Sequence, residues 1–395
     1  MAPAAGRSDR RVASWLALVG LSGAVALRPV ACTDGQDDVG AMTSAEVEHL
    51  LADVGPEVVQ PALADFLVAS GALETALAAW DGADDGRAEA QAAWQTAMSA
   101  WQRLELMQIG PAASSLTAVG GADLRDELYS WPTVNACRVD QETAEGDWDE
   151  PDFFTSNLVN SYGLDAIEHL LWAGLDNDCP SQSTPNSDGA WTALGEEGVA
   201  ANRAAFSRAL AAELTRQGGV LLGHWQGDFG VALAAGADPY EDPQQALNAV
   251  YDALFYLETM TKDRKLAWPL GSDDCGAESC PDDVEGLESG TGAQSIAANL
   301  EGFRALFTGG EGTGWDDLLA DLGHQDLSDQ ILADTDAALL LAQGISEPLD
   351  QLVTEDPARV QALHDAVKTV TDALKGDLAT ILNLQIPDEA AGDND

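Results

Sequence analysis

Apolar residues recur at spacings of three and four along most of the chain after residue 43, which is typical of helices that bury one face. Runs of β-branched residues are scarce, whereas Ala and Leu are abundant. The pattern predicts helices over residues 44–82 with a break at Gly55-Pro56, and over 84–108, 152–174, 191–235, 244–265, 294–307, 315–322, 326–342 and 356–384. We therefore expect an all-α protein.

Three other features of the pattern modify this expectation. A kink is expected near Gly218-Gly219, because two residues of low helix propensity follow one another there. Residues 129–140 have no clean period, and their aromatic, Pro and Arg content predicts an ordered, buried loop. Residues 141–151 are acidic and are expected to be exposed.

One helical run contains two carboxylates among apolar neighbours: Ser161-Tyr162-Gly163-Leu164-Asp165-Ala166-Ile167-Glu168-His169-Leu170-Leu171-Trp172. Residues three apart share a helix face, so Asp165 and Glu168 should project together. Gly163 indicates either an irregular helix start or a close contact at this point. A solvated acidic face is the ordinary explanation of such a pair, but the apolar neighbours leave only a narrow polar stripe.

The composition limits the classes of partner. The 395 residues include 18 basic and 67 acidic side chains, with a formal net charge of -49. Nucleic acid phosphates and anionic lipid headgroups would repel such a chain, so we expect neither as a partner. An acidic surface is also typical of a saline habitat or a secreted protein. The sequence contains no P-loop, dinucleotide-binding fingerprint, Gly-x-Ser-x-Gly or His-Glu-x-x-His motif.

The N-terminus has the pattern of an export signal. Basic residues precede the apolar run 12–27, which is too short for a stable membrane span, so residues 1–31 are predicted to be a signal peptide. A small residue before Cys32 resembles a bacterial lipoprotein cleavage box, although Arg28 and Pro29 depart from it. We expect lipidation of Cys32, with simple export and ordinary cleavage as the alternative. Residues 32–43 would be a tether, and Thr33 favours the outer membrane over the inner one.

The remaining cysteines number four, which in an exported chain implies disulfides. Cys275 and Cys280 lie in one short Gly-containing loop, so we expect a local bridge between them. Cys137 then pairs with Cys179 by elimination. A metal site of four thiolates is the alternative, but no Cys-x-x-Cys pair supports it.

Several blocks together resemble the imelysin-like family, which is also filed among the metallopeptidases. The segment from Gly163 to Glu168 resembles the family's Gly-x-His-x-x-Glu signature. Further blocks are similar to it along residues 45 to 385: Trp101 to Glu105 with Gly110-Pro111, Trp131-Pro132 to Cys137-Arg138-Val139-Asp140, Lys265-Leu266 to Pro269-Leu270-Gly271, Glu288-Ser289, and Asn299-Leu300-Glu301-Gly302.

The resemblance implies a fold of two helical bundles related by an internal pseudo-repeat. The N-terminal half would span residues 44–190 and the C-terminal half residues 191–387, with an acidic tail at 388–395. It also implies export, often with a lipid anchor, and a link to iron uptake or iron regulation. One branch of the family is described as insulin-cleaving.

Asp165 stands where the family signature has His. Two carboxylates favour harder cations than a His-carboxylate pair does, and they disfavour zinc-type peptidase chemistry. His169 could return an imidazole to the same face, or it could simply pack its ring. Buried carboxylates need partners; Arg138, Arg264 and Lys265 are candidates, and a buried ion-pair network without ligand is an alternative. The resemblance implies supporting roles for these residues: Gly163, Trp131, Arg138, Asp140, Arg264, Lys265 and Ser289.

Three hypotheses for function follow. The first is a non-enzymatic exported lipoprotein of the cell envelope that binds a divalent or ferric metal ion, or a small metal-bearing ligand. Its site would comprise Glu105, Asp165, Glu168 and His169, and an envelope transport partner could receive the ligand. The second is a metallopeptidase with Glu168 or Glu105 as general base. The third is a structural envelope protein with a vestigial site.

Overall fold

The computed structural model describes residues 44–83, 85–271, 275–387 and 390, and these residues form helices and no strand. The all-α prediction is confirmed. The predicted signal peptide, the tether with Cys32, and nearly all of the predicted acidic tail lie outside the described residues. The first half of the helices comprises α1 (Ser44–Asp53), η1 (Val54–Val59), α2 (Gln60–Ala79), α3 (Arg87–Glu105), η2 (Gly110–Ala112), α4 (Leu124–Leu128), α5 (Ala136–Glu145), α6 (Phe153–Ser156), η3 (Val159–Ser161) and α7 (Leu164–Trp172).

The remaining helices belong to the same compact unit. They are α8 (Ala190–Gln226), α9 (Asp228–Ala235), α10 (Pro243–Leu254), η4 (Leu257–Ala267), η5 (Pro281–Asp283), α11 (Gly292–Thr308), α12 (Trp315–Asp321), α13 (Gln325–Gln343), α14 (Leu349–Glu355), α15 (Pro357–Ala373), η6 (Leu374–Leu378) and α16 (Ala379–Leu382). The internal pseudo-repeat stays a prediction.

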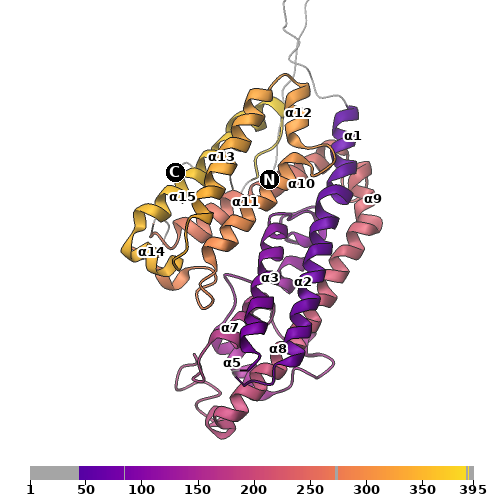
Figure 1. The fold of residues 1–395 in the computed structure, drawn as a ribbon. Coiled ribbons are helices and arrows are strands. Elements are labelled where there is room, and N and C mark those ends of the chain that lie inside the picture. Colours follow the sequence, from indigo (N-terminus) through magenta and orange to yellow (C-terminus); the bar gives the residue numbers. More distant parts are fainter. Residues whose placement is uncertain (1–43, 84, 272–274, 388–389, 391–395) are drawn as a thin grey trace, which may run out of the picture. The chain divides into compact units, whose positions relative to one another are not determined.

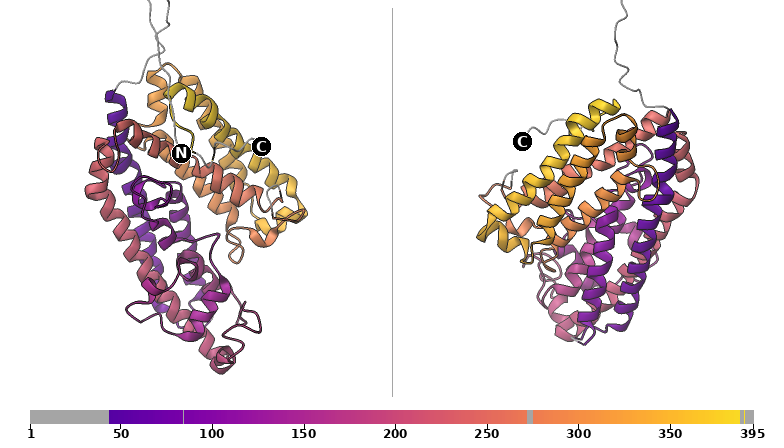
Figure 2. Two further views of the ribbon diagram at one scale, coloured as in Figure 1. Left: turned by 180° about the vertical axis from the view of Figure 1, so that it is seen from behind. Right: turned by 45° about the horizontal axis from the view of Figure 1, so that its top comes forward.

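The first group of helices is built around α2, which packs along both α3 and α8 (Figures 1 and 2). The shorter helices α5 and α7 pack against α8, and α7 also contacts α3. Trp94 on α3 donates from Nε1 to the carbonyl oxygen of Leu164 at 2.7 Å, which fixes the start of α7 against α3. By its packing, α8 joins the first group, although the predicted boundary at residue 190 places it in the second half.

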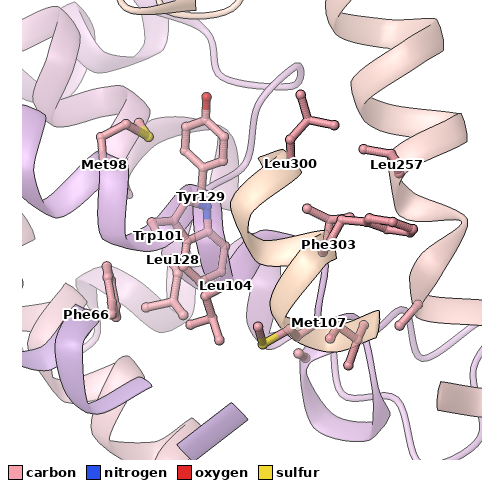
Figure 3. Close-up of a cluster of buried hydrophobic side chains, with 14 of the residues drawn as sticks. Phe66, Met98, Trp101, Leu104, Met107, Leu128, Tyr129, Leu257, Leu300 and Phe303 are labelled. Atoms are coloured by element: carbon pink, nitrogen blue, oxygen red, sulfur yellow. The ribbon is translucent and has the colours of Figure 1, made fainter. Parts of the chain in front are cut away.

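The helices from α10 to α16 form a second group, which packs on the first through the contact of α11 with α3. Gly302 allows this contact, because a Cβ atom at its position would lie 2.1 Å from the carbonyl oxygen of Arg103. Figure 3 shows side chains of both groups, among them Trp101, Leu300 and Phe303, in one buried apolar cluster. Farther out, α13 packs on α11 and α15, and α15 packs on η4.

The predicted helix over 152–174 is wrong in its first half. The backbone forms only the short α6 and η3 before α7 begins at Leu164. Gly163 sets this start, because its φ of 101° lies in the left-handed region that favours glycine and cannot continue a right-handed helix. The irregular helix start and the close contact that Gly163 indicates are both present, since a Cβ atom there would lie 3.0 Å from Asp165 Oδ1 and from the carbonyl oxygen of Leu128.

The segment predicted as a buried loop and an exposed acidic stretch contains α5. Asn135 begins this helix, because its side chain accepts a hydrogen bond from the backbone N–H of Arg138 at 2.9 Å. Glu142 and Thr143 on α5 are buried, so the prediction of exposure is wrong for them. Because the segment is acidic, its sequence did not indicate that it forms a helix with one buried face.

Glycines misled the prediction at two further places. The helix does not break at Gly55-Pro56, because the π-helix η1 joins α1 to α2 there. No kink occurs at Gly218-Gly219 inside α8; the non-helical backbone lies at Gly195, and the helix ends at Gly227. The short helices α4 and α14 fall where no helix was expected.

The described residues contain one helical stretch, Ala45–Ala79, that is long and apolar enough to cross a membrane. Its α2 part packs against α3 and α8, with Leu63, Phe66 and Leu73 fully buried. A core helix has the same length and composition as a membrane span, so this packing accounts for the apolar sequence.

Both predicted disulfides form. Cys137 at the start of α5 is bonded to Cys179, with their Cα atoms 4.5 Å apart. Cys275 is bonded to Cys280 across the predicted loop. The alternative of a metal site with four thiolates is therefore wrong.

Candidate functional site

A pocket of about 470 Å³ lies where α7, the segment after Trp131, the end of η4 and the loop before α11 meet. Its lining combines acidic side chains with aromatic and aliphatic ones. The residues are Trp131, Pro132, Val134, Ala136, Asp165, Glu168, His169, Arg264, Trp268, Asp282, Asp283, Val284, Gly286, Leu287 and Glu288. The two motif carboxylates thus reach one pocket, as their spacing predicts.

Asp165 occupies the first turn of α7 and is 5% exposed. Its Oδ2 accepts hydrogen bonds from the backbone N–H and the hydroxyl of Ser130, at 3.1 and 2.9 Å. Its Oδ1 accepts from the backbone N–H of Ala166 at 3.1 Å. Burial outweighs these hydrogen bonds and raises the pKa of Asp165 to about 7.

Glu168 lies one turn later on α7 and is 7% exposed. Its Oε1 accepts a hydrogen bond from the backbone N–H of Ser289 at 2.9 Å, which ties α7 to the loop before α11. Burial raises the pKa of Glu168 to about 7, and the nearby charges of Glu288 and Asp165 act in the same direction. Each carboxyl therefore exchanges its proton near neutral pH, where a bound cation could replace it.

Asp165 and Glu168 differ from the other buried carboxylates of the described chain, because neither forms an ion pair with a basic side chain. Each of the others has a Lys or Arg partner: Glu105 with Lys265 and Arg125, Asp140 with Arg203, Glu142 with Arg138, Glu213 with Arg216, Glu258 with Lys262 and Lys375, and Glu285 with Lys265. A buried carboxylate without a cation is costly, so these two groups either hold a proton or need a positive charge from outside the chain.

His169 follows Glu168 on α7, also lines the pocket, and uses both ring nitrogens within the protein. Nδ1 lies 2.7 Å from Glu288 Oε1, and Nε2 lies 3.2 Å from Asp140 Oδ1. Burial lowers the pKa of His169, but the hydrogen bonds to Asp140 and Glu288 outweigh it and raise the pKa to about 9. At neutral pH the ring is an imidazolium, which donates from both nitrogens and does not ligate a metal.

Asp140, His169 and Asp178 form a small cluster whose charged atoms lie within 4.8 Å of one another. Asp140 Oδ1 also accepts from Arg203 Nη2 at 3.1 Å, and its Oδ2 accepts from the backbone N–H of Asp178 at 2.9 Å. The imidazolium and the guanidinium balance the carboxylates of this cluster. It positions His169 and, through it, Glu288 at the pocket.

Glu105 belongs to a second cluster and does not line the pocket. It is fully buried on α3, with Oε2 2.7 Å from Lys265 Nζ and Oε1 2.9 Å from Arg125 Nη2. Burial raises the pKa of Glu105, but the charges of Lys265 and Arg125 outweigh it and hold the pKa below its ordinary value. The structure thus separates Glu105 from the two carboxylates with which the sequence analysis grouped it.

The second cluster contains several polar side chains that the sequence analysis missed. Lys265 Nζ also lies 2.9 Å from Glu285 Oε1, which accepts from the Tyr129 hydroxyl at 2.7 Å. Arg125 donates to the carbonyl oxygen of Trp131 at 2.7 Å, so the cluster also supports the aromatic wall of the pocket. No local sequence pattern marks Arg125 as buried, so its role could not be predicted.

The two arginines proposed as partners of the carboxylates have other roles. Arg138 pairs with Glu142 and donates to Asn157 Oδ1 at 2.9 Å. Arg264 lines the pocket and stacks on Trp268, with 4.1 Å from Cζ to the ring centroid. Neither forms an ion pair with Asp165 or Glu168. Lys265 does not pair with them either, because its ammonium neutralises Glu105 and Glu285.

The architecture and the pocket make this protein an all-helical bundle with an acidic pocket. Comparison of its sequence with family models identifies the family. The family model of imelysin, Peptidase M75, matches residues 59–376. The chain therefore belongs to the imelysin family.

Solved structures show the same fold. An imelysin-like protein from Psychrobacter arcticum 273-4 superposes with a TM-score of 0.67 at 18% identity, covering 87% of this chain and 98% of that one. A protein of Parabacteroides distasonis ATCC 8503, named as an iron-regulated protein A precursor, superposes with a TM-score of 0.65 at 15% identity, covering 87% and 96%. A comparison with curated proteins finds no significant match.

Proposed function

We propose that this protein is an exported, non-enzymatic binding protein that takes up a hard metal cation, alone or with a carrier, at Asp165 and Glu168. The observation that carries the proposal is the absence of a basic partner for these two buried carboxylates within the described chain. A divalent or ferric ion would supply the missing positive charge in place of a lysine or arginine.

The chemistry of the two residues fits such an ion. Carboxylate oxygens are the ligands that hard cations prefer, and both side chains line the pocket. Ser130 and Ser289 donate backbone N–H groups to Asp165 and Glu168 and so fix the orientation of both carboxylates. When bound, the ion would supply positive charge, and Glu288 is the adjacent carboxylate that could join the other two.

Export and anchoring complete the proposal. Two disulfides indicate an oxidising compartment such as the periplasm or the cell surface. The apolar N-terminal run followed by Cys32 supports a signal peptide and a lipid anchor, with the outer membrane preferred. The related fold named as an iron-regulated protein A precursor supports a role in iron handling in the cell envelope.

Metal binding tests the site directly. Titration calorimetry with Mn²⁺ should show one site in the wild type and none in the double variant Asp165→Asn with Glu168→Gln. A matched control is Asp329→Asn with Glu355→Gln, which removes two exposed carboxylates on α13 and α14 and should bind as the wild type does. Equal binding in all three proteins would overturn the proposal.

Two further measurements test the remaining parts. Cleavage of an unfolded protein substrate that is lost in Glu168→Gln would contradict the non-enzymatic assignment. Membrane fractionation and mass spectrometry should find the wild type acylated at Cys32 and membrane-bound, and Cys32→Ala released. A wild type found entirely in the soluble fraction would contradict the anchor.

A further inference from the structure

The pocket is larger than a metal ion requires. Its volume of about 470 Å³ lies within the range of about 300–1,000 Å³ that is usual for pockets that hold organic ligands. A bare cation at Asp165 and Glu168 would occupy only a small part of this volume. Most of the volume therefore points to a second component of the ligand.

Arg264 is the one Lys or Arg side chain that lines the pocket in the described chain. Its guanidinium stacks on Trp268, and Trp268 is itself held by a hydrogen bond from Nε1 to Asp283 Oδ2 at 3.1 Å. Stacking uses the face of a guanidinium and leaves its N–H edge free to bind a carboxylate. Arg264 forms no ion pair and no side-chain hydrogen bond with any described residue, whereas the adjacent Lys265 makes ion pairs with Glu105 and Glu285.

Apolar side chains line much of the remaining wall. Trp131, Pro132, Val134 and Leu287 contribute to it, and Trp268 adds a second indole. Surfaces of this kind bind carbon frameworks, which lose water when they pack against an indole ring. A bare, hydrated ion would gain little from contact with such a surface.

The charge of the whole chain limits the ligand further. A protein with a net charge of -49 repels strongly anionic complexes from its surface. A complex in which the metal charge balances the carboxylates of its carrier avoids this repulsion. It still presents a cation to Asp165 and Glu168 and a carboxylate to Arg264.

We propose that the pocket binds a small metal chelate of low net charge, whose metal ion faces Asp165 and Glu168 and whose carboxylate pairs with Arg264. The inference rests on the proposed function and specifies its ligand class. The chelator lies against Trp131 and Trp268, and the metal keeps coordination positions open for the two protein carboxylates.

Ferric nitrilotriacetate is a suitable probe, because its three carboxylates balance the ferric charge and leave two coordination positions open. We would titrate it, Mn²⁺ alone and metal-free nitrilotriacetate into the wild type, Arg264→Gln and the control Arg304→Gln. Arg304 is exposed on α11 and pairs with Asp336, away from the pocket residues.

Arg264→Gln should change the two metal probes in opposite directions. Loss of a charge-assisted hydrogen bond should weaken binding of the chelate by about ten- to a hundred-fold. Binding of Mn²⁺ should be unchanged or tighter, because a nearby positive charge is removed. A variant that merely folds poorly would weaken both. Arg304→Gln should behave as the wild type.

The outcomes separate this inference from the function on which it rests. Binding of Mn²⁺ without binding of the chelate in the wild type, or chelate binding in Arg264→Gln equal to that of the wild type, would overturn the chelate and leave the cation site standing. Tight binding of metal-free nitrilotriacetate would also overturn it, because the metal would then be dispensable. A wild type that binds neither metal probe would overturn the cation site and the chelate together.

Discussion

Lys265 Nζ lies 2.7 Å from Glu105 Oε2, although 160 positions separate the two residues in the sequence. Lys265 is on η4 and Glu105 is on α3, so this buried ion pair links the two groups of helices. The same ammonium lies 2.9 Å from Glu285 Oε1, in the loop beside the pocket. One charge therefore links α3 to η4 and to the loop that carries Glu285, and the last two of these contribute to the pocket.

Replacing Lys265 by Met should destabilise the protein strongly. Glu105 would keep Arg125 as its one basic partner in the described chain, and Glu285 would lose its basic partner. Breaking a buried pair by removing one member costs about 3–5 kcal/mol. Urea unfolding should show this loss. A matched control is Lys368→Met, which breaks the more exposed pair with Asp372 on α15 and should cost at most about 0.5 kcal/mol. Equal losses would contradict the assignment of the network.

Replacing Glu168 by Gln should stabilise the metal-free protein at alkaline pH. Its folded pKa is about 7, against an ordinary value of 4.5. A raised acid pKa means that this group stabilises the fold at low pH and costs stability as pH rises from 4.5 through 7. The full cost above pH 8 is roughly 3 kcal/mol, at about 1.4 kcal/mol per pKa unit. Unfolding of Glu168→Gln should be less dependent on pH across this range; a parallel profile would contradict the raised pKa.

Cation binding should become tighter as pH rises from 6 to 8. Asp165 and Glu168, each with a pKa of about 7, must lose their protons before they bind a metal. The affinity for Mn²⁺ should increase roughly ten- to a hundred-fold over this range, since one or both protons are displaced. Calorimetry in buffers of different ionisation enthalpy should detect the released protons. Binding without proton release would show that the carboxylates are already ionised.

His169 should titrate near pH 9, well above its ordinary value of 6.5. A raised histidine pKa contributes stability that is fully present below pH 6.5 and is lost as pH rises through 9. NMR of ring-labelled histidine should resolve this shift, with His169→Gln for assignment and His324 as a reference ring outside the cluster. A titration of His169 near 6.5 would contradict the paired imidazolium.

Gly163→Ala should destabilise the protein, because a Cβ atom would meet Asp165 Oδ1 and the Leu128 carbonyl oxygen at 3.0 Å and the φ of 101° would be strained. The expected loss is about 1–3 kcal/mol. Gly219 on α8 provides the control, since nothing lies within 4 Å of its Cβ position. Gly219→Ala should therefore stabilise the protein by about 0.4–1 kcal/mol. Thermal unfolding of both variants distinguishes a strained position from a merely flexible one.

The sequence predicts the helical class, both disulfides and the convergence of Asp165 and Glu168 well. Helical spacing and cysteine parity are local properties, and they do not depend on tertiary contacts. Gly163 correctly indicated the irregular start of α7, because the backbone conformation of a glycine is also a local property. Gly218 was misleading, because a glycine inside a well-packed helix can keep helical dihedrals at a modest cost.

The partners of the buried charges could not be predicted from the sequence. Glu105 was grouped with Asp165 because both lie in family-like blocks, yet its own partners come from α4 and η4. Arg125 and Glu285 carry no local pattern that distinguishes them from surface charges. Which carboxylate receives which cation depends on tertiary packing, and a chain with 67 acidic side chains offers many alternatives.

The bridge between Cys137 and Cys179 makes the support of the pocket dependent on the redox state of these two thiols. Cys179 directly follows Asp178, whose backbone N–H donates to Asp140 behind His169, while Cys137 lies one turn before Asp140 on α5. The covalent link thus keeps the support of the pocket together only where thiols are oxidised. A chain with both thiols reduced lacks that link, so the support of His169 and Glu288 beside the pocket would rest on hydrogen bonds and ion pairs alone.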